Sequence, residues 1–397
     1  MQGHFYFSLK DETQDIREDI ALRFIECGQR YYDENEEELQ KLLLVEHELP
    51  VEEYYTVICQ KRPTLGCRAL VQRSLRMIQI VMMEMQDWKE EVRLHSLKLL
   101  WQFVLHAEQA FTCKFTEIFP NLARCCQDTD KGVVAEAERV AELMGRLLEY
   151  EKWFEYACEQ LKTPSLGVLR CFTALFKSSS SIKRNDVEKV AEILANPSIC
   201  QNLKETYQRS LLDLCENLID LHLTDAAFVD NEQLIGDSLV KSISPRESSN
   251  PNEERLLVEI LIKTIALSRD NEDGFVNENG KRVLEKLARS AGNLPVLYGR
   301  YVKGVIDSIE DLDCEHSERS ESILILFGCI AHCGFQPEYL ESMKHAINLV
   351  LTHSTPYAKV KIFSGISMVR LLLIDFLQEI DQYFSLFTRL YLIGPQQ

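Results

Sequence analysis

Glycine and proline are scarce in this sequence of 397 residues, with 16 and 11 copies. Helix interiors exclude both residues, so their scarcity favours helices over sheets. No run of alternating polar and apolar residues is long enough to predict a sheet. The apolar stretch from Leu256 to Leu267 also fits a buried helix of about three turns. The composition therefore predicts an all-α protein.

The sequence also lacks the segments that direct a chain into a membrane or a secretory pathway. Residues 1–19 contain no basic region followed by an apolar core, so they do not resemble a signal peptide. The most apolar stretch, from Ile362 to Leu377, is interrupted by Arg370 and Asp375, so it cannot span a bilayer. The 13 cysteines are scattered and odd in number, unlike a secreted disulfide framework. These features indicate the reducing cytoplasm or nucleus.

Positive charge is in deficit, because 44 Lys and Arg face 62 Asp and Glu, for a formal net charge of −18. Nucleic-acid binding depends on Lys and Arg that neutralise phosphates, and anionic membranes attract basic surfaces. The charge therefore predicts neither nucleic-acid nor membrane binding. It suits basic protein partners, although acidity also serves solubility.

Apolar residues recur at helical spacing along most of the chain. Between Val92 and Phe103 they fall on one side of a predicted helix, with polar residues on the flank. Short breaks separate such segments, at Gly145, Thr163-Pro164, Asn196-Pro197, Asn293-Leu294-Pro295 and Thr355-Pro356. The pattern predicts medium-length helices joined by tight turns.

A short motif recurs in this helical pattern, with an Asp followed five positions on by a β-branched residue and then Arg or Val. Its copies are Asp11 with Ile16 and Arg17, Asp87 with Val92 and Arg93, and Asp128 with Val133 and Val134. The last two Asp residues are 41 positions apart, within the period of about 40–47 residues of HEAT and armadillo repeats. The copies at Asp87 and Asp128 each lie between two apolar helices, predicted over 77–85 and 92–105 and over 115–125 and 133–148.

We assign each motif residue a structural role. The Asp lies in the turn between the two helices of a repeat, where it can cap the second helix. The β-branched residue is the first core residue of that helix. The Arg reaches the Asp of a neighbouring repeat and so forms a ladder along the protein.

These repeats predict an α-solenoid of HEAT-type helical repeats, continuous over residues 1–397, with about eight or nine helix pairs. Three stretches interrupt the helical pattern: an inter-repeat insertion at 47–63, a mobile loop at 242–254 and an acidic loop at 268–280 that ends in a turn at Asn279-Gly280. The chain begins inside a repeat, so we expect residues of a longer natural protein to precede it.

No motif predicts catalysis, a cofactor or a metal. The segment from Gly274 to Arg282 resembles a phosphate loop, but its spacing is one residue too long and Arg282 replaces the Ser or Thr that binds magnesium. The same acidic segment does not fit the ligand spacing of a calcium loop, which leaves weak, non-specific divalent binding or a solvated loop. Cys329, His332 and Cys333 share a helix face as zinc ligands would, but they also suit small core positions.

Four residues on predicted second helices are candidates for partner binding: Trp101, Gln102, Glu136 and Arg139. Second helices line the concave wall of a solenoid, where exposed aromatic residues anchor partners. The alternative for Trp101 is packing against the second helix of the next repeat. In the Cys125-Cys126 pair, we expect one thiol to face inward and the other to lie near the repeat edge.

Several unusual strings resemble the C-terminal HEAT repeats of the dynein axonemal assembly factor five family. They are 34–42 (ENEEELQKL), 62–75 (RPTLGCRALVQRSL), 87–110, 118–145 and, less sharply, 294–307 (LPVLYGRYVKGVID). The resemblance is clear over the first third to half of the chain and patchy after Ser178.

The resemblance implies a non-enzymatic cytoplasmic scaffold that preassembles the outer and inner dynein arms of motile cilia. Its implied partners are axonemal dynein intermediate or heavy chains and co-chaperones, with no cofactor. Two alternatives remain open on the repeats alone: a HEAT-repeat nuclear transport receptor or phosphatase scaffold, and a hydrolase built on the solenoid.

Overall fold

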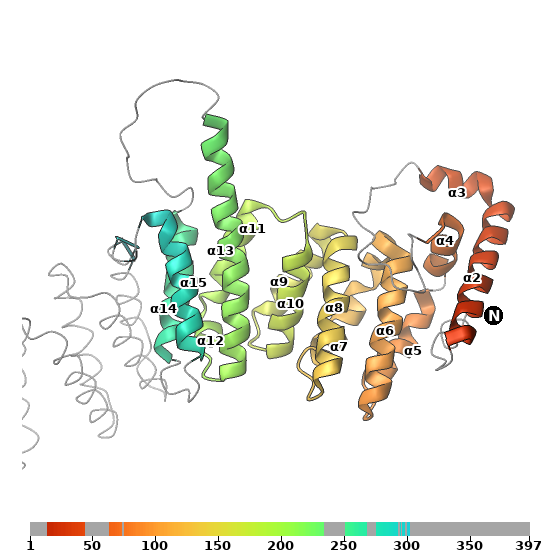
Figure 1. Cartoon of the computed structure of the whole chain (residues 1–397), viewed down its shortest axis with the longest axis horizontal. Helices are drawn as coiled ribbons and strands as arrows, with labels where there is room; N and C mark the ends of the chain where they lie inside the picture. The colour runs from red at the N-terminus through yellow and green to blue at the C-terminus, as the bar shows by residue number, and fades with distance from the viewer. Residues whose placement is uncertain are drawn as a thin grey trace, which may run out of the picture. The chain divides into compact units, whose positions relative to one another are not determined.

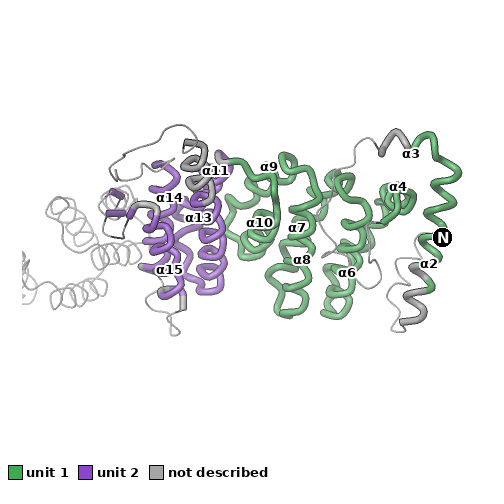
Figure 2. Tube along the Cα trace, turned by 45° about the horizontal axis from the view of Figure 1, so that its top comes forward, with its two compact units in different colours: residues 1–183 green, residues 184–397 purple. Residues whose placement is uncertain are grey.

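The computed structural model describes residues 14–43, 63–73, 75–233, 251–267 and 275–292, together with positions 294, 296, 297, 300 and 301. These residues form helices and connecting turns, and no strand occurs among them (Figure 1). The all-α fold predicted from the composition is thereby confirmed. The chain divides into two compact units, residues 1–183 and 184–397 (Figure 2). The prediction of one continuous solenoid with eight or nine pairs stays a prediction.

The first unit contains nine α-helices and two short 3₁₀ helices in the part that is described. They are α2 (Gln14–Glu34), α3 (Glu36–Leu43), α4 (Leu65–Arg73), η2 (Leu75–Met77), α5 (Ile78–Glu84), α6 (Glu90–Ala107), η3 (Glu108–Lys114), α7 (Phe115–Cys125), α8 (Lys131–Leu147), α9 (Tyr150–Leu161) and α10 (Leu166–Ser178). The predicted helices over 77–85, 92–105, 115–125 and 133–148 correspond to α5, α6, α7 and α8.

The helices of the first unit form antiparallel pairs, α5 with α6, α7 with α8 and α9 with α10. The second helices α6, α8 and α10 pack side by side (Figure 1), and α7 also packs against α10 of the following pair. This is the arrangement of a HEAT-type repeat, in which each pair buries its apolar faces against its neighbours. The core of the unit is rich in aromatic residues, with Phe103, Phe111, Phe119, Trp153 and Phe172 fully buried.

Polar side chains determine where several helices begin. The Asp130 carboxylate accepts a hydrogen bond from the Val133 amide at 2.9 Å and so caps α8. Ser165 caps α10 in the same way.

A proline lies inside one helix of this unit, because α7 contains Pro120. Proline has no N–H to donate, and the Thr116 carbonyl one turn earlier accepts a hydrogen bond from the Tyr156 hydroxyl at 3.4 Å instead.

The second unit contains five helices in its described part: α11 (Arg184–Leu194), α12 (Pro197–Cys200), α13 (Glu205–Gln233), α14 (Pro251–Leu267) and α15 (Phe275–Ala291). The pairs α11 with α14, α13 with α14 and α13 with α15 are in contact. The apolar stretch 256–267 lies in α14, where Leu257, Ile260, Leu261 and Ile265 are fully buried, so the expected buried helix is confirmed.

Two sequence boundaries are corrected by the structure. Residues 251–254 of the predicted mobile loop form the first turn of α14, and residues 275–280 of the predicted acidic loop form the start of α15. Pro251 is pre-organised for the first helical position, which makes it a helix start and not a loop residue. Residues 242–250, 268–274 and 47–62 of the predicted irregular stretches lie outside the described residues.

Gly145 is not a helix break, because it lies inside α8 where α10 approaches closely. A Cβ atom at Gly145 would lie 2.2 Å from the Leu175 carbonyl oxygen. Gly167 has the same role at the contact of α10 with α7, where a Cβ atom would lie 1.9 Å from the Ala123 carbonyl oxygen. Both glycines are needed because carbon and oxygen atoms cannot approach so closely without moving a backbone.

Replacing Gly167 by alanine is expected to destabilise the first unit by roughly 1–3 kcal/mol, because the new methyl group overlaps the Ala123 backbone. Intrinsic helix propensity alone would predict a gain of about 1 kcal/mol for the same change. Gly132→Ala, at an exposed position of α8, is the control and should change stability by less than about 1 kcal/mol. Urea unfolding followed by circular dichroism measures both; equal midpoints for the two variants would contradict the close approach.

Candidate partner-binding surfaces

The turn between α5 and α6 is tied to the next turn by an arginine and an aspartate. Arg93 on α6 donates from Nε and Nη2 to the two carboxylate oxygens of Asp128, at 2.7 and 2.8 Å. Its Nη1 also donates to the main-chain oxygens of Asp87 and Trp88, at 2.9 and 3.0 Å. Arg93 thus joins two successive repeats, and this contact is the one that the motif spacing predicts.

Electrostatics and hydrogen bonding favour the charged form of this pair. Burial alone would raise the pKa of the Asp128 carboxyl, but hydrogen bonds from Arg93 and from the Asp130 amide bring the pKa below its ordinary value. The same hydrogen bond raises the pKa of Arg93. Both side chains are largely buried, so the pair is a structural clamp between repeats.

The capping role assigned to the motif Asp was wrong. Asp128 accepts from Arg93 and from the Asp130 amide, and Asp130, two residues later, caps α8. Asp87 accepts from the Lys89 amide at 2.8 Å, and α6 begins without a side-chain cap. The aspartates therefore shape the turns, because a carboxylate that binds the amide two residues on fixes the local backbone.

The other motif residues match their assigned roles to different degrees. Val133 is fully buried, as its assignment to the core predicts, whereas Val92 is half-buried. Ile16 and Arg17 lie in α2, and Asp11 lies outside the described residues. The turn contact does not repeat identically at α10, where Arg170 donates to the Cys126 carbonyl oxygen at 3.1 Å.

Asp128→Asn is expected to lower the free energy of unfolding by about 1–3 kcal/mol at neutral pH, because an amide cannot accept from Arg93 through both atoms. The folded-state pKa of Asp128 is depressed, so its stabilising effect is present above the unfolded pKa of about 3.9 and is lost as the pH falls through the folded pKa. Urea midpoints of wild type and variant should therefore converge in acid. Glu151→Gln, which removes an exposed partner of Lys183, should leave the midpoint unchanged.

The second helices α6 and α8 bring together three of the four predicted partner-binding residues. The Arg139 guanidinium lies over the Trp101 ring, 4.6 Å from its centroid, and Arg139 also pairs with Glu136 at 3.5 Å. Trp101 is only 2% exposed, so its ring is covered by the protein and the packing alternative describes it. Arg139 is exposed. Gln102 is half-buried, and its main-chain oxygen lies 2.8 Å from His106 Nδ1.

The expectation that one thiol of the Cys125-Cys126 pair lies near an edge is wrong, because both are buried. Burial raises the pKa of Cys125 to about 12. A hydrogen bond with Cys171 and burial raise the pKa of Cys126 as well. Both groups are therefore neutral thiols and poor nucleophiles; the Cys125 thiol donates to the Met85 carbonyl oxygen at 3.6 Å, and Cys126 contacts Cys171 of α10.

The most exposed aromatic residue of the described part was missed by the sequence analysis. Trp88 lies in the turn between α5 and α6 and is 82% exposed. Met83 and Ile80 on α5 are 70% and 39% exposed. The signal was present in the sequence, where a Trp stands in the polar segment Asp87-Trp88-Lys89-Glu90 between two apolar helices.

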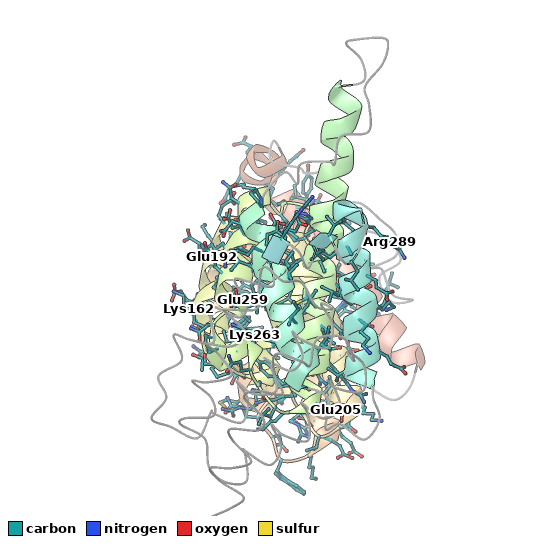
Figure 3. The ribbon with its side chains drawn as sticks, turned by 90° about the vertical axis from the view of Figure 1, so that its left-hand side faces the viewer. Lys162, Glu192, Glu205, Glu259, Lys263 and Arg289 are labelled. Carbon is teal, nitrogen blue, oxygen red and sulfur yellow. The ribbon has the colours of Figure 1, made fainter. Side chains whose placement is uncertain are left out.

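The second unit buries an unusual number of charged side chains on α14. Glu253 Oε1 lies 2.7 Å from Nδ1 of His222 on α13, and both side chains are buried. Glu259 pairs with Lys263 one turn further along α14, and Figure 3 labels both residues. Pairing offsets the cost of removing these charges from water. The contact of His222 with Glu253 joins α13 to α14, whereas Glu259 and Lys263 pair within α14.

The motif that resembles a phosphate loop and the possible zinc ligands lie in different parts of the chain. Gly280, Lys281 and Arg282 lie inside α15, so no phosphate-binding turn forms at these residues. Cys329, His332 and Cys333 lie outside the described residues. Among the described residues, no group of three or more His, Cys, Asp or Glu side chains has the geometry to hold a metal ion. Within the same part of the chain, no helix combines the length and apolarity needed to cross a membrane.

Comparison with known proteins gives a family match over part of the chain. The HEAT-repeat domain of dynein axonemal assembly factor 5 matches residues 54–237. This part of the chain, residues 54–237, is similar to that HEAT-repeat domain. The resemblance found in the sequence is confirmed, and α4 to α13 are the described helices of the first and second units that this domain includes.

Relatives named dynein axonemal assembly factor 5 match most of the chain. The Drosophila melanogaster protein is 34% identical over 371 residues, which are 91% of this chain and 41% of that protein. The human protein is 24% identical over 95% of this chain and 41% of its own length. The Xenopus laevis protein is 29% identical over 56% of this chain and 27% of its own length. The chain thus spans at most about two fifths of these relatives.

Proposed function

We propose that this chain acts as a non-catalytic scaffold in the cytoplasmic preassembly of axonemal dynein arms, both outer and inner, for motile cilia. The proposal rests on the family match, because the matching relatives carry the name of dynein axonemal assembly factors. Its partners would be dynein intermediate or heavy chains and co-chaperones. The HEAT-repeat fold supports this role, since stacked helix pairs offer extended surfaces for other proteins.

The structure of the first unit supports binding without chemistry. Its partly buried ion pairs, Arg93 with Asp128 and Arg68 with Glu108, join elements of the fold to one another. The net charge of −18 favours client surfaces rich in Lys and Arg, and such complementarity raises association rates and selects partners. We propose that contacts are distributed along α6 and α8, with Arg139 among them.

Affinity capture from ciliated cells, followed by crosslinking mass spectrometry, tests this function. We expect axonemal dynein chains and co-chaperones among the specific partners, with crosslinks on the helical surfaces of the repeats. Recovery of a Ran-type GTPase or of a phosphatase catalytic subunit, without dynein chains, would favour the transport-receptor or phosphatase-scaffold alternative. Turnover of ester or nucleotide substrates by the purified chain would instead favour an enzyme.

A further inference from the structure

Trp88 is the starting point, because large aromatic side chains rarely lie almost fully in solvent. It is 82% exposed, whereas the other two tryptophans, Trp101 and Trp153, are 2% and 0% exposed. Tryptophan is enriched among the residues that contribute most to protein–protein binding, since its ring buries a large area with few rotatable bonds. An exposed Trp in a turn is therefore a candidate anchor.

Two further apolar side chains extend the exposed surface along α5. Ile80 and Met83 are three residues apart, so they lie on the same face of the helix. Gln86 continues that line into the turn that carries Trp88, and it is exposed as well. We define Ile80, Met83 and Trp88 as the Trp88 surface. Single exposed apolar residues are ordinary, but a helix face that leads to an exposed Trp indicates an interaction site.

The turn that carries Trp88 is held firmly although its ring is exposed. Arg93 donates to the Trp88 carbonyl oxygen while the Asp128 carboxylate fixes its guanidinium group. The Asp87 carboxylate binds the Lys89 amide, and the Lys89 ammonium lies 5.1 Å from the centroid of the Trp88 ring. A turn that is ordered before binding loses little conformational entropy when a partner docks.

The charges around the Trp88 surface favour a basic partner. Residues 84–91 contain four carboxylates and one lysine, and Glu90 and Glu91 are exposed. Asp128 neutralises Arg93. Two nearby cations keep their charge, Lys89 over the Trp88 ring and Arg124 against the neutral Gln86 at 3.2 Å, and they are outnumbered by the four carboxylates. An apolar strip beside exposed carboxylates complements a segment with an apolar face and cationic neighbours.

We propose that the Trp88 surface docks an amphipathic helical segment of a partner protein that carries Lys or Arg beside its apolar stripe. This inference rests on the proposed function, because it names the chemistry by which one partner of the scaffold is recognised. A helix fits because its apolar residues at three- and four-residue spacing can lie along Ile80 and Met83 and end at Trp88.

Synthetic peptides test the proposal with the whole chain. The probe is an amphipathic helix of about 18 residues with a Leu stripe flanked by Lys, free of Trp and Tyr, and its twin carries Glu in place of Lys. We expect the basic peptide to bind at least tenfold more tightly than the acidic twin, with a blue shift of Trp88 emission. Trp88→Ala should lower the affinity for the basic peptide at least tenfold.

Two variants serve as controls for this binding assay. Leu203→Ala removes another exposed apolar side chain, 54% exposed and in the second unit, and should bind the basic peptide like the wild type. Glu90→Gln combined with Glu91→Gln should lower the affinity for the basic peptide and reduce the difference in affinity between the basic and the acidic peptide. Equal binding of both peptides, unchanged binding to Trp88→Ala, or a Trp88-dependent dimer in sedimentation would overturn the proposal.

Capture from ciliated cells separates this inference from the proposed function. If Trp88→Ala loses at least one dynein chain or co-chaperone that the wild type and Leu203→Ala both retain, the docking surface is supported. If all three proteins capture the same dynein chains equally, the Trp88 surface is wrong and the scaffold function stands. If none of them captures a dynein chain, the proposed function fails, and the peptide assay alone decides the chemistry of the surface.

Discussion

Replacing Leu99 by aspartate is expected to unfold the repeats around α6. Leu99 is 3% exposed, and its helix α6 packs against α4, α5 and α8. The change removes a buried Leu, which costs about 2–5 kcal/mol, and places an unpaired carboxylate in an apolar site at a further cost of several kcal/mol. The whole stability of a domain is about 5–15 kcal/mol, so little would remain.

Circular dichroism during urea unfolding measures this loss directly. Lys98→Asp is the matched control, because Lys98 is the exposed neighbour of Leu99 on the same helix. The control should change the free energy of unfolding by no more than about 0.5 kcal/mol, the range of surface substitutions. A Leu99→Asp protein that unfolds at the same urea concentration as Lys98→Asp would show that Leu99 does not belong to the core.

The same variant has a consequence for partner capture. Each helix pair in a repeat protein is stabilised by its neighbours, so loss of α6 also weakens α5 and α8. We expect Leu99→Asp to lose partners although Leu99 itself touches none. Lys98→Asp should retain them, which distinguishes loss of the fold from loss of a contact residue.

Trp101→Ala is expected to destabilise the first unit by about 3–5 kcal/mol, because the indole is 2% exposed and fills the contact between α6 and α8. The substitution leaves a cavity and also removes the ring over which the Arg139 guanidinium lies. Trp101→Phe retains an aromatic ring and should recover a large part of the lost stability. Equilibrium unfolding in urea measures all three proteins.

Trp88→Ala is the matched control, since the same residue type is removed from a position that is 82% exposed. It should change the free energy of unfolding by less than about 0.5 kcal/mol. The two tryptophans thus separate two roles: Trp101 contributes to stability and Trp88 to docking. Trp101→Ala protein with the midpoint of the wild type would indicate that the ring does not pack as the structure describes.

These tryptophans show what spacing along a sequence does and does not decide. Helical periodicity placed Trp101 on a predicted second helix, and that position is compatible with both a groove and a contact with the next repeat. The decision depends on the following second helix, α8, whose Arg139 lies over the ring and pairs with Glu136. Burial is a property of neighbouring helices, so a single helix pattern leaves it open.

The motif residues give a second example. The interval of 41 residues placed Arg93 near the following turn, and Arg93 does bind Asp128. The capping residue was misassigned, because Asp128 and Asp130 are both suitable caps by type and only the backbone path of the turn separates them. Likewise, Gly145 looks like a break until α10 is placed against it.

The sequence by itself determined the helical class, the HEAT-like period, the main helices of the first unit and the resemblance to an assembly-factor family. These properties follow from composition and from spacing within one or two helices, which are local. Only the tertiary structure decided which side chains are covered, namely that Trp101 is enclosed, that both Cys125 and Cys126 are buried, and that Trp88 is left in solvent. The reason is physical: exposure is set by the helices that stack against a residue, and those helices come from other repeats.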